Sequence, residues 1–387
     1  MKTILLAISG SIAFYKSYEL ISLFKKEGFR VKVLLSNGLL KFASKMSFEA
    51  LVDEVLCEEN ESWQNSNNHI AFSKDVDLVL FTPASVNSIN KLAFGIADNL
   101  FIQTLIAANK PLIIAPAANT NMFHHFSTQN SLKILKENKA LIIEPICKVL
   151  ACKDEGVGAL AEVKDIFNIT KRELLKEKFW CNKSVVITGG GTRERIDDVR
   201  CVSNFSSGKM AKAIADAFYF LGARVKLLSS VEFDTPYELC KFESSKDLKE
   251  LLDKNLSHDF LIMTAAVSDF IPQSVKGKIK KNEHLQGLNL HLSLNEDLLK
   301  TCKFQGKKIG FKMEFDSQNA LENAKKSLKD KQLDMVCLNI IDQKNYFGSD
   351  QNELYFITLN NENKSTLQSK EKLAFELVKW CENYEYD

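Results

Sequence analysis

The chain has 387 residues, 45% of them apolar and 26% charged, and its 51 basic and 49 acidic side chains leave a net charge of +2. This composition is typical of a globular protein with two or three domains of about 150 residues, and it gives no global signal for nucleic acid. No stretch approaches the ~20 apolar residues that cross a bilayer, and the run after Lys2 is too short for a signal peptide, so no membrane contact is expected.

The first half of the chain alternates short apolar runs with segments of helical spacing. The apolar runs are residues 3–9, 30–36, 77–82, 111–115 and 140–143, and the helices expected between them are residues 15–26 and 99–109. This alternation predicts an α/β fold with a parallel sheet. Residues 146–161 break the pattern with glycines and mixed charge, which predicts a loop or flap.

A charged amphipathic segment, residues 162–178, precedes a restart of the same pattern and indicates a domain boundary near residue 180. Beyond it, the expected strands are residues 184–188, 224–229 and 259–264, and residues 207–221 are an expected helix. Later runs at 288–292, 308–311, 334–339 and 353–358 are expected to complete a second sheet. The predicted fold is therefore α/β, with two doubly wound, Rossmann-like domains in tandem, residues 1–180 and 181–387.

The first apolar run ends in Gly10, Ser11 and Ile12 and leads directly into a helix. Such a turn directs backbone N–H groups beyond the end of the strand, where a phosphate group is a suitable occupant. The G-x-G-x-x-G fingerprint is absent, and the second run ends in Ser36 where a dinucleotide site would offer an acidic residue, so NAD is disfavoured. By themselves, these residues fit a mononucleotide phosphate site and an ordinary strand-to-helix turn about equally well.

Two further polar turns follow the third and fourth apolar runs. Ser85 ends the segment Thr-Pro-Ala-Ser, and Asn119 lies in Ala-Pro-Ala-Ala-Asn-Thr-Asn-Met. In a doubly wound sheet, ligands bind outside the carboxyl ends of the strands. We therefore expect these turns to contribute to one site.

Four motifs in residues 1–180 resemble those of the flavin-containing cysteine decarboxylases, with phosphopantothenoylcysteine decarboxylase as the best match. They are Ser-Gly-x-Ile-Ala-x-Tyr-Lys from residue 9, Asn-His-Ile from residue 68, Pro-Ala-x-Asn-x-x-Met from residue 116 and Ala-Cys-x-Asp-x-Gly-x-Gly from residue 151. The resemblance implies a flavodoxin-like domain that uses FMN. The implied FMN-binding residues are Gly10, Ser11, Ile12, Ser36 and Ser85.

The same resemblance implies three catalytic residues. His69 would manage the proton of the substrate thiol, a task that suits a group titrating near neutral pH. Asn119 would bind the substrate carboxylate, and Cys152 would donate a proton to the decarboxylated enethiolate. Taken by themselves, these residues would more simply be a surface histidine, a turn cap and a small buried cysteine.

The implied chemistry uses FMN to oxidise the cysteinyl thiol to a thioaldehyde, so that carbon dioxide can leave, and then to return the hydride. The sequence departs from the family at two positions. Ala118 stands where the family has a methionine, which should affect only packing. Lys153 stands where the family has a glycine, which should affect the geometry of the flap.

Five motifs after residue 183 closely resemble those of phosphopantothenate–cysteine ligases. They are Thr-x-x-x-Thr-Arg-Glu from residue 188, Asp-x-Val-Arg from 197, Ser-Asn-x-Ser-Ser-Gly-Lys-Met from 203, Ala-Ala-Val-x-Asp from 265 and Lys-Ile-Lys-Lys from 278. By itself the glycine run is a tight turn, and Ser206 or Ser207 is a helix N-cap. The resemblance implies that CTP converts the substrate carboxylate into an acyl-cytidylate, which the amine of cysteine attacks.

The resemblance also assigns residues to this second site. Asn204 would handle the acyl-cytidylate and Lys278 the nucleotide phosphates, and the remaining nucleotide-site residues would be Ala265, Asp269, Phe311, Lys325 and Lys329. Asp269 is a candidate to help hold a divalent cation, Mg²⁺ or Mn²⁺, which polyphosphate chemistry needs. By themselves, Lys325 and Lys329 fit an ordinary solvated helical face.

A decarboxylase followed by a ligase matches a bacterial fusion of coenzyme A biosynthesis, with 4′-phosphopantothenate, L-cysteine and CTP as small-molecule partners. One alternative is a nicotinamide-dependent dehydrogenase, which is disfavoured because neither half has the dinucleotide fingerprint. The other is a regulatory binding subunit, which would be expected to lack Cys152 or the ligase motifs. The resemblance implies a homo-oligomer with trimeric decarboxylase and dimeric ligase contacts. Nine cysteines without a C-x-x-C pair favour a reducing, cytoplasmic location.

Overall fold

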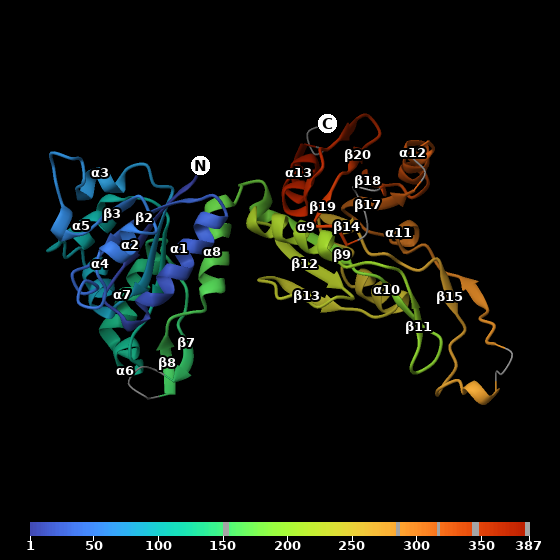
Figure 1. Ribbon diagram of the computed structural model, residues 1–387, viewed down its shortest axis with the longest axis horizontal. Helices are drawn as coiled ribbons and strands as arrows, with labels where there is room; N and C mark the ends of the chain where they lie inside the picture. The colour runs from blue at the N-terminus through green and yellow to red at the C-terminus, as the bar shows by residue number, and fades with distance from the viewer. Residues whose placement is uncertain (150–154, 284–286, 316–317, 343–347, 384–387) are drawn as a thin grey trace. The chain divides into compact units, whose positions relative to one another are not determined.

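The structure is a computed structural model that describes residues 1–149, 155–283, 287–315, 318–342 and 348–383 (Figure 1). The chain divides into two compact units, Met1–Leu174 and Leu175–Asp387, which we call unit 1 and unit 2. Within the described residues, no helix is both long and apolar enough to span a membrane. The eight described cysteines are all free thiols.

Unit 1 contains a six-stranded parallel sheet with the strand order β3-β2-β1-β4-β5-β6. Its strands are β1 (Thr3–Ile8), β2 (Arg30–Leu35), β3 (Glu54–Leu56), β4 (Leu78–Ala84), β5 (Leu112–Pro116) and β6 (Leu141–Ile142). β1 pairs with β2 on one side and with β4 on the other. The order of the strands reverses at β1 and β4, which is where a doubly wound sheet forms its binding crevice.

Helices cover both faces of this sheet. Successive side chains of β1 enter opposite cores, because a strand alternates its faces. Ile4, Leu6 and Ile8 pack with α1 (Lys16–Lys26) and α8 (Val163–Leu175). Leu5 and Ala7 pack in the other core, which contains side chains of α3 (His69–Ser73), α4 (Val86–Ala93), α5 (Leu100–Ala107) and α7 (Phe126–Glu137). The doubly wound α/β fold expected from the alternating pattern is present.

The expected loop at residues 146–161 is an antiparallel hairpin formed by β7 (Ile146–Val149) and β8 (Glu155–Ala159). The prediction of a loop was therefore wrong for both strands. The side chains of β7 are mostly exposed and β8 contains two glycines, so the segment lacks the apolar alternation by which a half-buried strand is predicted. Cys152 and Lys153, which stand between these strands in the sequence, lie outside the described residues.

Unit 2 repeats this topology in a larger sheet with the order β13-β12-β9-β14-β17-β18-β20-β21. Its strands are β9 (Ser184–Gly189), β12 (Arg224–Ser229), β13 (Glu238–Lys241), β14 (Phe260–Met263), β17 (Lys307–Glu314), β18 (Met335–Ile340), β20 (Tyr355–Ile357) and β21 (Glu362–Lys364). The first six strands in the sheet order are parallel, and β20 and β21 add antiparallel pairs at one edge. The reversal lies between β9 and β14.

Two cores also flank the sheet of unit 2. One contains α9 (Lys209–Phe220), α13 (Lys370–Asn383) and the fully buried Trp180. The other contains α10 (Ser245–Asp253), α11 (Leu298–Thr301) and α12 (Ala320–Asp330). Both units are thus doubly wound α/β folds.

A pair of hairpins projects from this unit beyond the main sheet, and we call it the arm (Figure 1). It consists of the described parts of residues 193–203, with β10 (Arg193–Arg195) and β11 (Cys201–Ser203), and of residues 270–294, with β15 (Phe270–Pro272) and β16 (Leu292–Leu294). The apolar run at 288–292 was expected in the main sheet, and this was wrong. Its leucines are exposed on the arm, because alternating apolar residues indicate a strand without indicating which sheet it joins.

Candidate functional sites

The first candidate site is a cleft of about 720 Å³ at the carboxyl edge of the unit 1 sheet, a size usual for ligand pockets. Four of the residues expected to bind FMN line it, namely Gly10, Ser11, Ser36 and Ser85. The fifth, Ile12, is 56% exposed and does not line the cleft. The strand ends expected to meet do therefore form one cavity.

Ser9 holds two of the turns of this cleft together. Its buried hydroxyl donates to the carbonyl oxygen of Pro83 at 2.7 Å and accepts from the backbone N–H of Ser85, also at 2.7 Å. The Ser85 hydroxyl in turn donates to Ser88 at 3.2 Å. These bonds fix the end of β1 against the end of β4 at the point where the strand order reverses.

The cleft lining has the chemistry of a flavin mononucleotide site. Its polar groups are mostly neutral hydroxyls and amides, while Val86, Phe101 and Met122 offer apolar surface to a ring system. Within the described residues, the backbone N–H groups of Gly10 and Ser11 make no hydrogen bond, as is suitable for a turn that receives a phosphate. The residues present therefore fit FMN.

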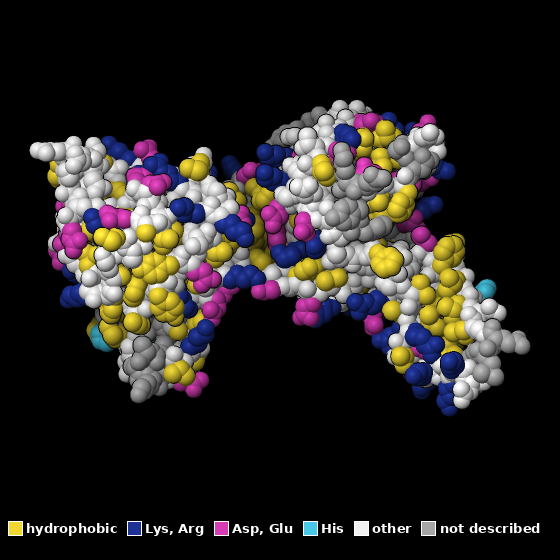
Figure 2. Space-filling model, in the orientation of Figure 1, with side chains coloured by type: hydrophobic (Ala, Val, Ile, Leu, Met, Phe, Trp, Pro, Cys, Tyr) yellow, Lys and Arg dark blue, Asp and Glu magenta, His cyan; other side chains and the backbone are white. Residues whose placement is uncertain are grey.

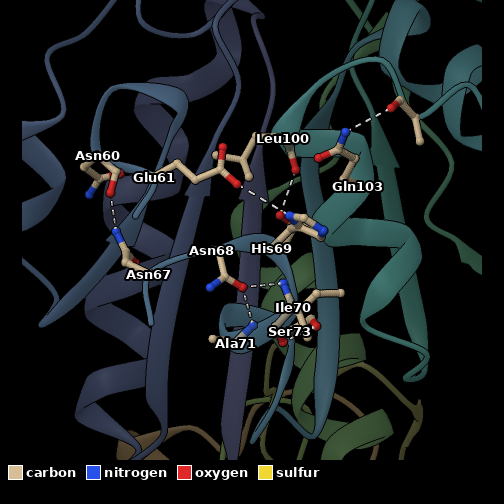
Figure 3. A network of polar contacts seen from close by, with 12 residues as sticks. Asn60, Glu61, Asn67, Asn68, His69, Ile70, Ala71, Ser73, Leu100 and Gln103 are labelled. Carbon is tan, nitrogen blue, oxygen red and sulfur yellow. Dashed lines mark hydrogen bonds and ion pairs between the residues drawn. The ribbon is translucent and has the colours of Figure 1, made fainter. Parts of the chain in front are cut away.

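His69 is the first residue of α3, and the side chain of Asn68 caps this helix by accepting from Ile70 N and Ala71 N (Figure 3). Its Nδ1 lies 3.5 Å from Glu61 Oε1, without the geometry of a hydrogen bond. The edge of its ring also contacts Trp63, with the ring centres 5.5 Å apart. His69 does not line the cleft of the same chain, and its side chain is 23% exposed.

Asn119 is the N-cap of α6 (Thr120–His124), where its Oδ1 accepts from the backbone N–H of Asn121 at 2.9 Å. It directly follows Ala117 and Ala118, both of which line the cleft. The hairpin of β7 and β8 lies against this turn, because the N–H of Ala118 donates to the carbonyl of Gly158 at 2.9 Å. The structure therefore joins two of the sequence motifs, although Cys152 itself is outside the described residues.

The second candidate site is a cleft in unit 2, again at the carboxyl ends of central strands. Two expected nucleotide-site residues line it, Ala265 after β14 and Phe311 on β17. The segment from Phe205 to Ala211 forms another wall. Gly208, in the left-handed conformation, is the N-cap of α9, so neither Ser206 nor Ser207 holds that position; the Ser207 hydroxyl accepts from Lys209 N at 3.5 Å.

Three lysines that line this cleft, Lys209, Lys312 and Lys370, were not identified from the sequence, and Lys312 forms an ion pair with Glu314 at 3.1 Å. Lys209 donates to Asp350 Oδ1 at 2.7 Å, and Lys370 donates to the carbonyl of Ser349. Partial burial, followed by repulsion from Lys209, lowers the pKa of Lys370 below its ordinary value. Lys209 is part of the Ser-Ser-Gly-Lys-Met motif and could have been named from it, whereas nothing near Lys370 in the sequence indicates a site.

Asn204 lies beside the glycine turn that follows β9. A Cβ on Gly191 would come within 2.5 Å of the Asn204 carbonyl oxygen, so the close approach of the two segments requires glycine there. The side-chain amide of Asn204 donates to the carbonyl of Val267 at 3.2 Å. Three motifs of the second half, those beginning at residues 188, 203 and 265, are thereby connected at one edge of the sheet.

The structure does not bring the other expected nucleotide-site residues into this cleft. Asp269 and Lys278 are exposed on or beside the arm, and Lys329 is exposed on α12. Lys325, on the same helix, forms an ion pair with Glu362 at 2.8 Å. Among the described residues, no group of three or more His, Cys, Asp or Glu side chains is arranged to hold a metal ion.

Comparison with known proteins divides the chain in the same way. Residues 1–175 match the Flavoprotein family, and residues 180–384 match the DNA/pantothenate metabolism flavoprotein C-terminal domain. The coenzyme A biosynthesis bifunctional protein CoaBC of Bacillus subtilis is 35% identical over 392 residues, covering 97% of this chain and 96% of the relative. The Haemophilus influenzae protein of the same name is 32% identical over 386 residues, with coverage of 97% and 96%. A solved C-terminal domain of a CoaBC protein shares 30% identity, covers 55% of this chain and 100% of that domain, and has a TM-score of 0.45.

Proposed function

Because the chain belongs to the CoaBC family of bifunctional proteins of coenzyme A biosynthesis, we propose that its two clefts carry out two consecutive reactions. Unit 2 is a ligase that joins 4′-phosphopantothenate to L-cysteine, and unit 1 is a decarboxylase that converts the resulting phosphopantothenoylcysteine into 4′-phosphopantetheine. The observation that carries this proposal is the match of both family domains over nearly the whole chain, each with a cleft at its topological reversal.

In unit 1, we assign the cleft to FMN, with Gly10, Ser11, Ile12, Ser36 and Ser85 around it. Bound FMN supplies the reversible oxidation of the cysteinyl thiol that makes loss of carbon dioxide possible. Ile12 belongs to this assignment only through its backbone and its place in the turn, since its side chain lies outside the cleft.

The protein groups of unit 1 position the substrate and handle its protons. His69 manages the thiol proton, and Glu61 Oε1 lies 3.5 Å from its Nδ1. Asn119 orients the substrate carboxylate, and the bond from Asn121 N fixes the plane of its amide. Cys152 gives the proton that completes the product. His69 does not line the FMN cleft of its own chain, which supports a trimeric assembly in which one subunit completes the site of another.

In unit 2, we assign the cleft to CTP, with Ala265 and Phe311 beside the nucleotide. The carboxylate of 4′-phosphopantothenate attacks CTP, pyrophosphate leaves, and the amine of cysteine then displaces CMP to form the amide. Asn204 contacts the acyl-cytidylate, and Lys278 stabilises the charge of the departing pyrophosphate. We also assign Lys325 and Lys329 of α12 to the nucleotide, and Lys325 is paired with Glu362.

Mg²⁺ or Mn²⁺ enters this site with the nucleotide. Magnesium is typically held by one or two carboxylates together with substrate phosphates and water, so a preformed protein cage is not required. Asp269 is the carboxylate that we assign to it.

Exposed apolar side chains on the arm, among them Phe270 and Leu294, support a dimer of unit 2. A cytoplasmic location accords with the free thiols of the described cysteines.

The test is to purify the protein, record its visible absorption spectrum and supply 4′-phosphopantothenate, cysteine, CTP and Mg²⁺. We expect a flavin spectrum and formation of 4′-phosphopantetheine, followed by mass spectrometry. Accumulation of phosphopantothenoylcysteine would remove the decarboxylase assignment and keep the ligase. A colourless protein without either product would favour the regulatory binding subunit. A Cys152→Ser variant should retain flavin and carbon dioxide release but stall before the final product.

A further inference from the structure

The tip of the β10–β11 hairpin is closed by a buried carboxylate. Asp197 is 1% exposed, and its Oδ1 accepts from the backbone N–H groups of Val199 at 2.8 Å and Arg200 at 2.7 Å. The Arg200 guanidinium lies 3.1 Å from the other oxygen, Oδ2. Asp197, Val199 and Arg200 belong to the Asp-x-Val-Arg motif, to which no role has been assigned above.

The same tip holds the segment that carries Lys278. Asp197 Oδ2 accepts from the backbone N–H of Ile279 at 3.1 Å, and Arg200 donates to the Ile279 carbonyl at 2.6 Å. On the other side of Lys278, Asp198 Oδ2 accepts from Gly277 N at 2.8 Å, and Asp198 N donates to the Gly277 carbonyl at 3.2 Å. Both neighbours of Lys278 are therefore fixed, while its side chain is exposed. Basic side chains gather on the arm (Figure 2).

The hairpin also leads directly to Asn204. β11 ends at Ser203, the residue before Asn204, and Asn204 donates to Val267 beside the cleft. A single short element thus connects the position of Lys278 with that of Asn204. We propose that the Asp197 carboxylate is a positioning residue of the ligase, which fixes Lys278 relative to Asn204. This inference rests on the role proposed above for Lys278.

A carboxylate is the group suited to this task. Ionised oxygens accept several N–H bonds at once, and such charge-assisted bonds are stronger than neutral ones. Burial of Asp197 acts to raise its pKa, but the bonds from Val199, Ile279 and Arg200 hold the pKa below its ordinary value. An asparagine would place an NH₂ group against N–H donors. Asp197→Asn therefore keeps the size of the side chain and weakens either the bond from Ile279 N or the bonds from Val199 N and Arg200 N.

The experiment uses the full-length protein and measures pyrophosphate release as a function of CTP, phosphopantothenate and cysteine concentration. The variants are Asp197→Asn, Lys278→Ala and the double variant. Asp198→Ala removes only the exposed contact to Gly277 and so keeps the test available if Asp197→Asn does not fold. Asp259→Asn is the matched control, because Asp259 also accepts from backbone and hydroxyl donors, those of Ser184, but at the opposite edge of the sheet.

We expect Asp197→Asn to lower kcat/KM for CTP about tenfold, the factor expected from loss of a buried hydrogen bond, with KM for cysteine and the decarboxylase rate unchanged. Asp198→Ala should change the same constant in the same direction by less, and Asp259→Asn should lower only the melting temperature. In the Lys278→Ala background, Asp197→Asn should cause no further loss.

Three results would overturn the inference. One is an equal rise in KM for all three substrates in the Asp197 and Asp259 variants, which would show a structural role alone. The second is a double variant that is slower than Lys278→Ala. The third is a normal Asp197→Asn rate beside an impaired Lys278→Ala, which would show that Lys278 does not depend on Asp197. If Lys278→Ala instead has wild-type ligase activity, the proposed role of Lys278 itself is wrong.

Discussion

The Cα atom of Gly158 lies against the carbonyl oxygen of Ala118, where a Cβ atom would come within 2.2 Å of that oxygen. The contact places the β7–β8 hairpin directly beside Asn119. A glycine is required there for space, and the alanine that replaces the usual methionine at 118 takes part through its backbone.

We predict that Gly158→Ala will displace the hairpin and impair the decarboxylase. The expected loss is at least about tenfold in rate, since a shift of about 1 Å in a reacting group costs up to about 100-fold. Carbon dioxide release from phosphopantothenoylcysteine measures it, with the flavin spectrum and the ligase rate unchanged. The control is Gly95→Ala, because Gly95 also has a positive φ, 66° against 157° at Gly158, but a Cβ there would meet no atom within 4 Å, so this variant has the backbone strain without the clash. Equal losses in both variants would contradict the steric explanation.

Replacement of His69 should separate flavin binding from catalysis. His69→Asn is expected to retain the flavin spectrum, because His69 does not line the cleft, and to lower the decarboxylase rate by roughly 100-fold or more, as for loss of a general acid–base group. His258→Asn is the control, since His258 is a histidine of unit 2 whose ring contacts the Asn255 carbonyl. If the variant loses both its flavin spectrum and its decarboxylase activity, His69 belongs to the cofactor site.

Asn204→Ala should abolish ligase turnover and leave the decarboxylase intact. The variant loses the amide that lies at the glycine turn and donates to Val267, so the acyl-cytidylate would lack its partner. Asn255→Ala removes a comparable amide, which donates to the Leu251 carbonyl at 2.7 Å, and should affect stability without affecting turnover. An unchanged pyrophosphate release rate in Asn204→Ala would exclude Asn204 from the reaction.

The stability of unit 2 should depend on the ionisation of Asp259 in acid. Burial acts to raise its pKa, but the bonds from Ser184 outweigh it and hold the pKa below the usual value of 3.8. A lowered pKa means that the ionised carboxylate stabilises the fold fully above about pH 4, and that this contribution is lost as the pH falls through the lowered pKa. The melting temperatures of the wild type and of Asp259→Asn should therefore differ at pH 7, and the difference should shrink as the pH falls below 3.8. A melting-temperature difference that does not change with pH would contradict the stabilising role of the ionised Asp259 carboxylate.

Trp180 anchors the core of unit 2. It is fully buried, and its ring lies 4.9 Å from that of Phe218 and 5.3 Å from that of Phe260. Trp180→Ala should destabilise unit 2 by about 3–5 kcal/mol. Denaturant unfolding followed by ligase activity measures this effect, while the visible flavin spectrum reports on unit 1. Simultaneous loss of both signals at the same lower denaturant concentration would show that the units unfold together.

Much of the fold was predictable, because the parallel strands are buried on both faces and therefore form continuous apolar runs. Residues 4–8 and 185–187 are examples, and both lie in strands. The short β3 and the exposed β7 were missed because neither has such a run. The run at 288–292 shows the opposite error, since its leucines alternate but are exposed on the arm.

The sites were partly predictable for a related reason. Ser36, Ser85 and Ala265 follow apolar runs, and a residue at the end of a parallel strand is placed at the binding edge by topology alone. Lys370 could not be found in this way, since it enters the unit 2 cleft from a C-terminal helix far along the chain. The positions of His69 and Lys278 depend on α3 and on the arm, whose packing local sequence does not specify.

Each of the four apolar clusters draws its members from one unit only, and none of the described core residues is shared between the two. Mutations that loosen one core therefore need no compensating change in the other, so each half is free to diverge at its own rate. The peptide link keeps the ligase, which forms the intermediate, close to the decarboxylase, which uses it. By this reasoning, a gene split between the codons for Leu174 and Trp180 would lose that proximity and keep both catalysts.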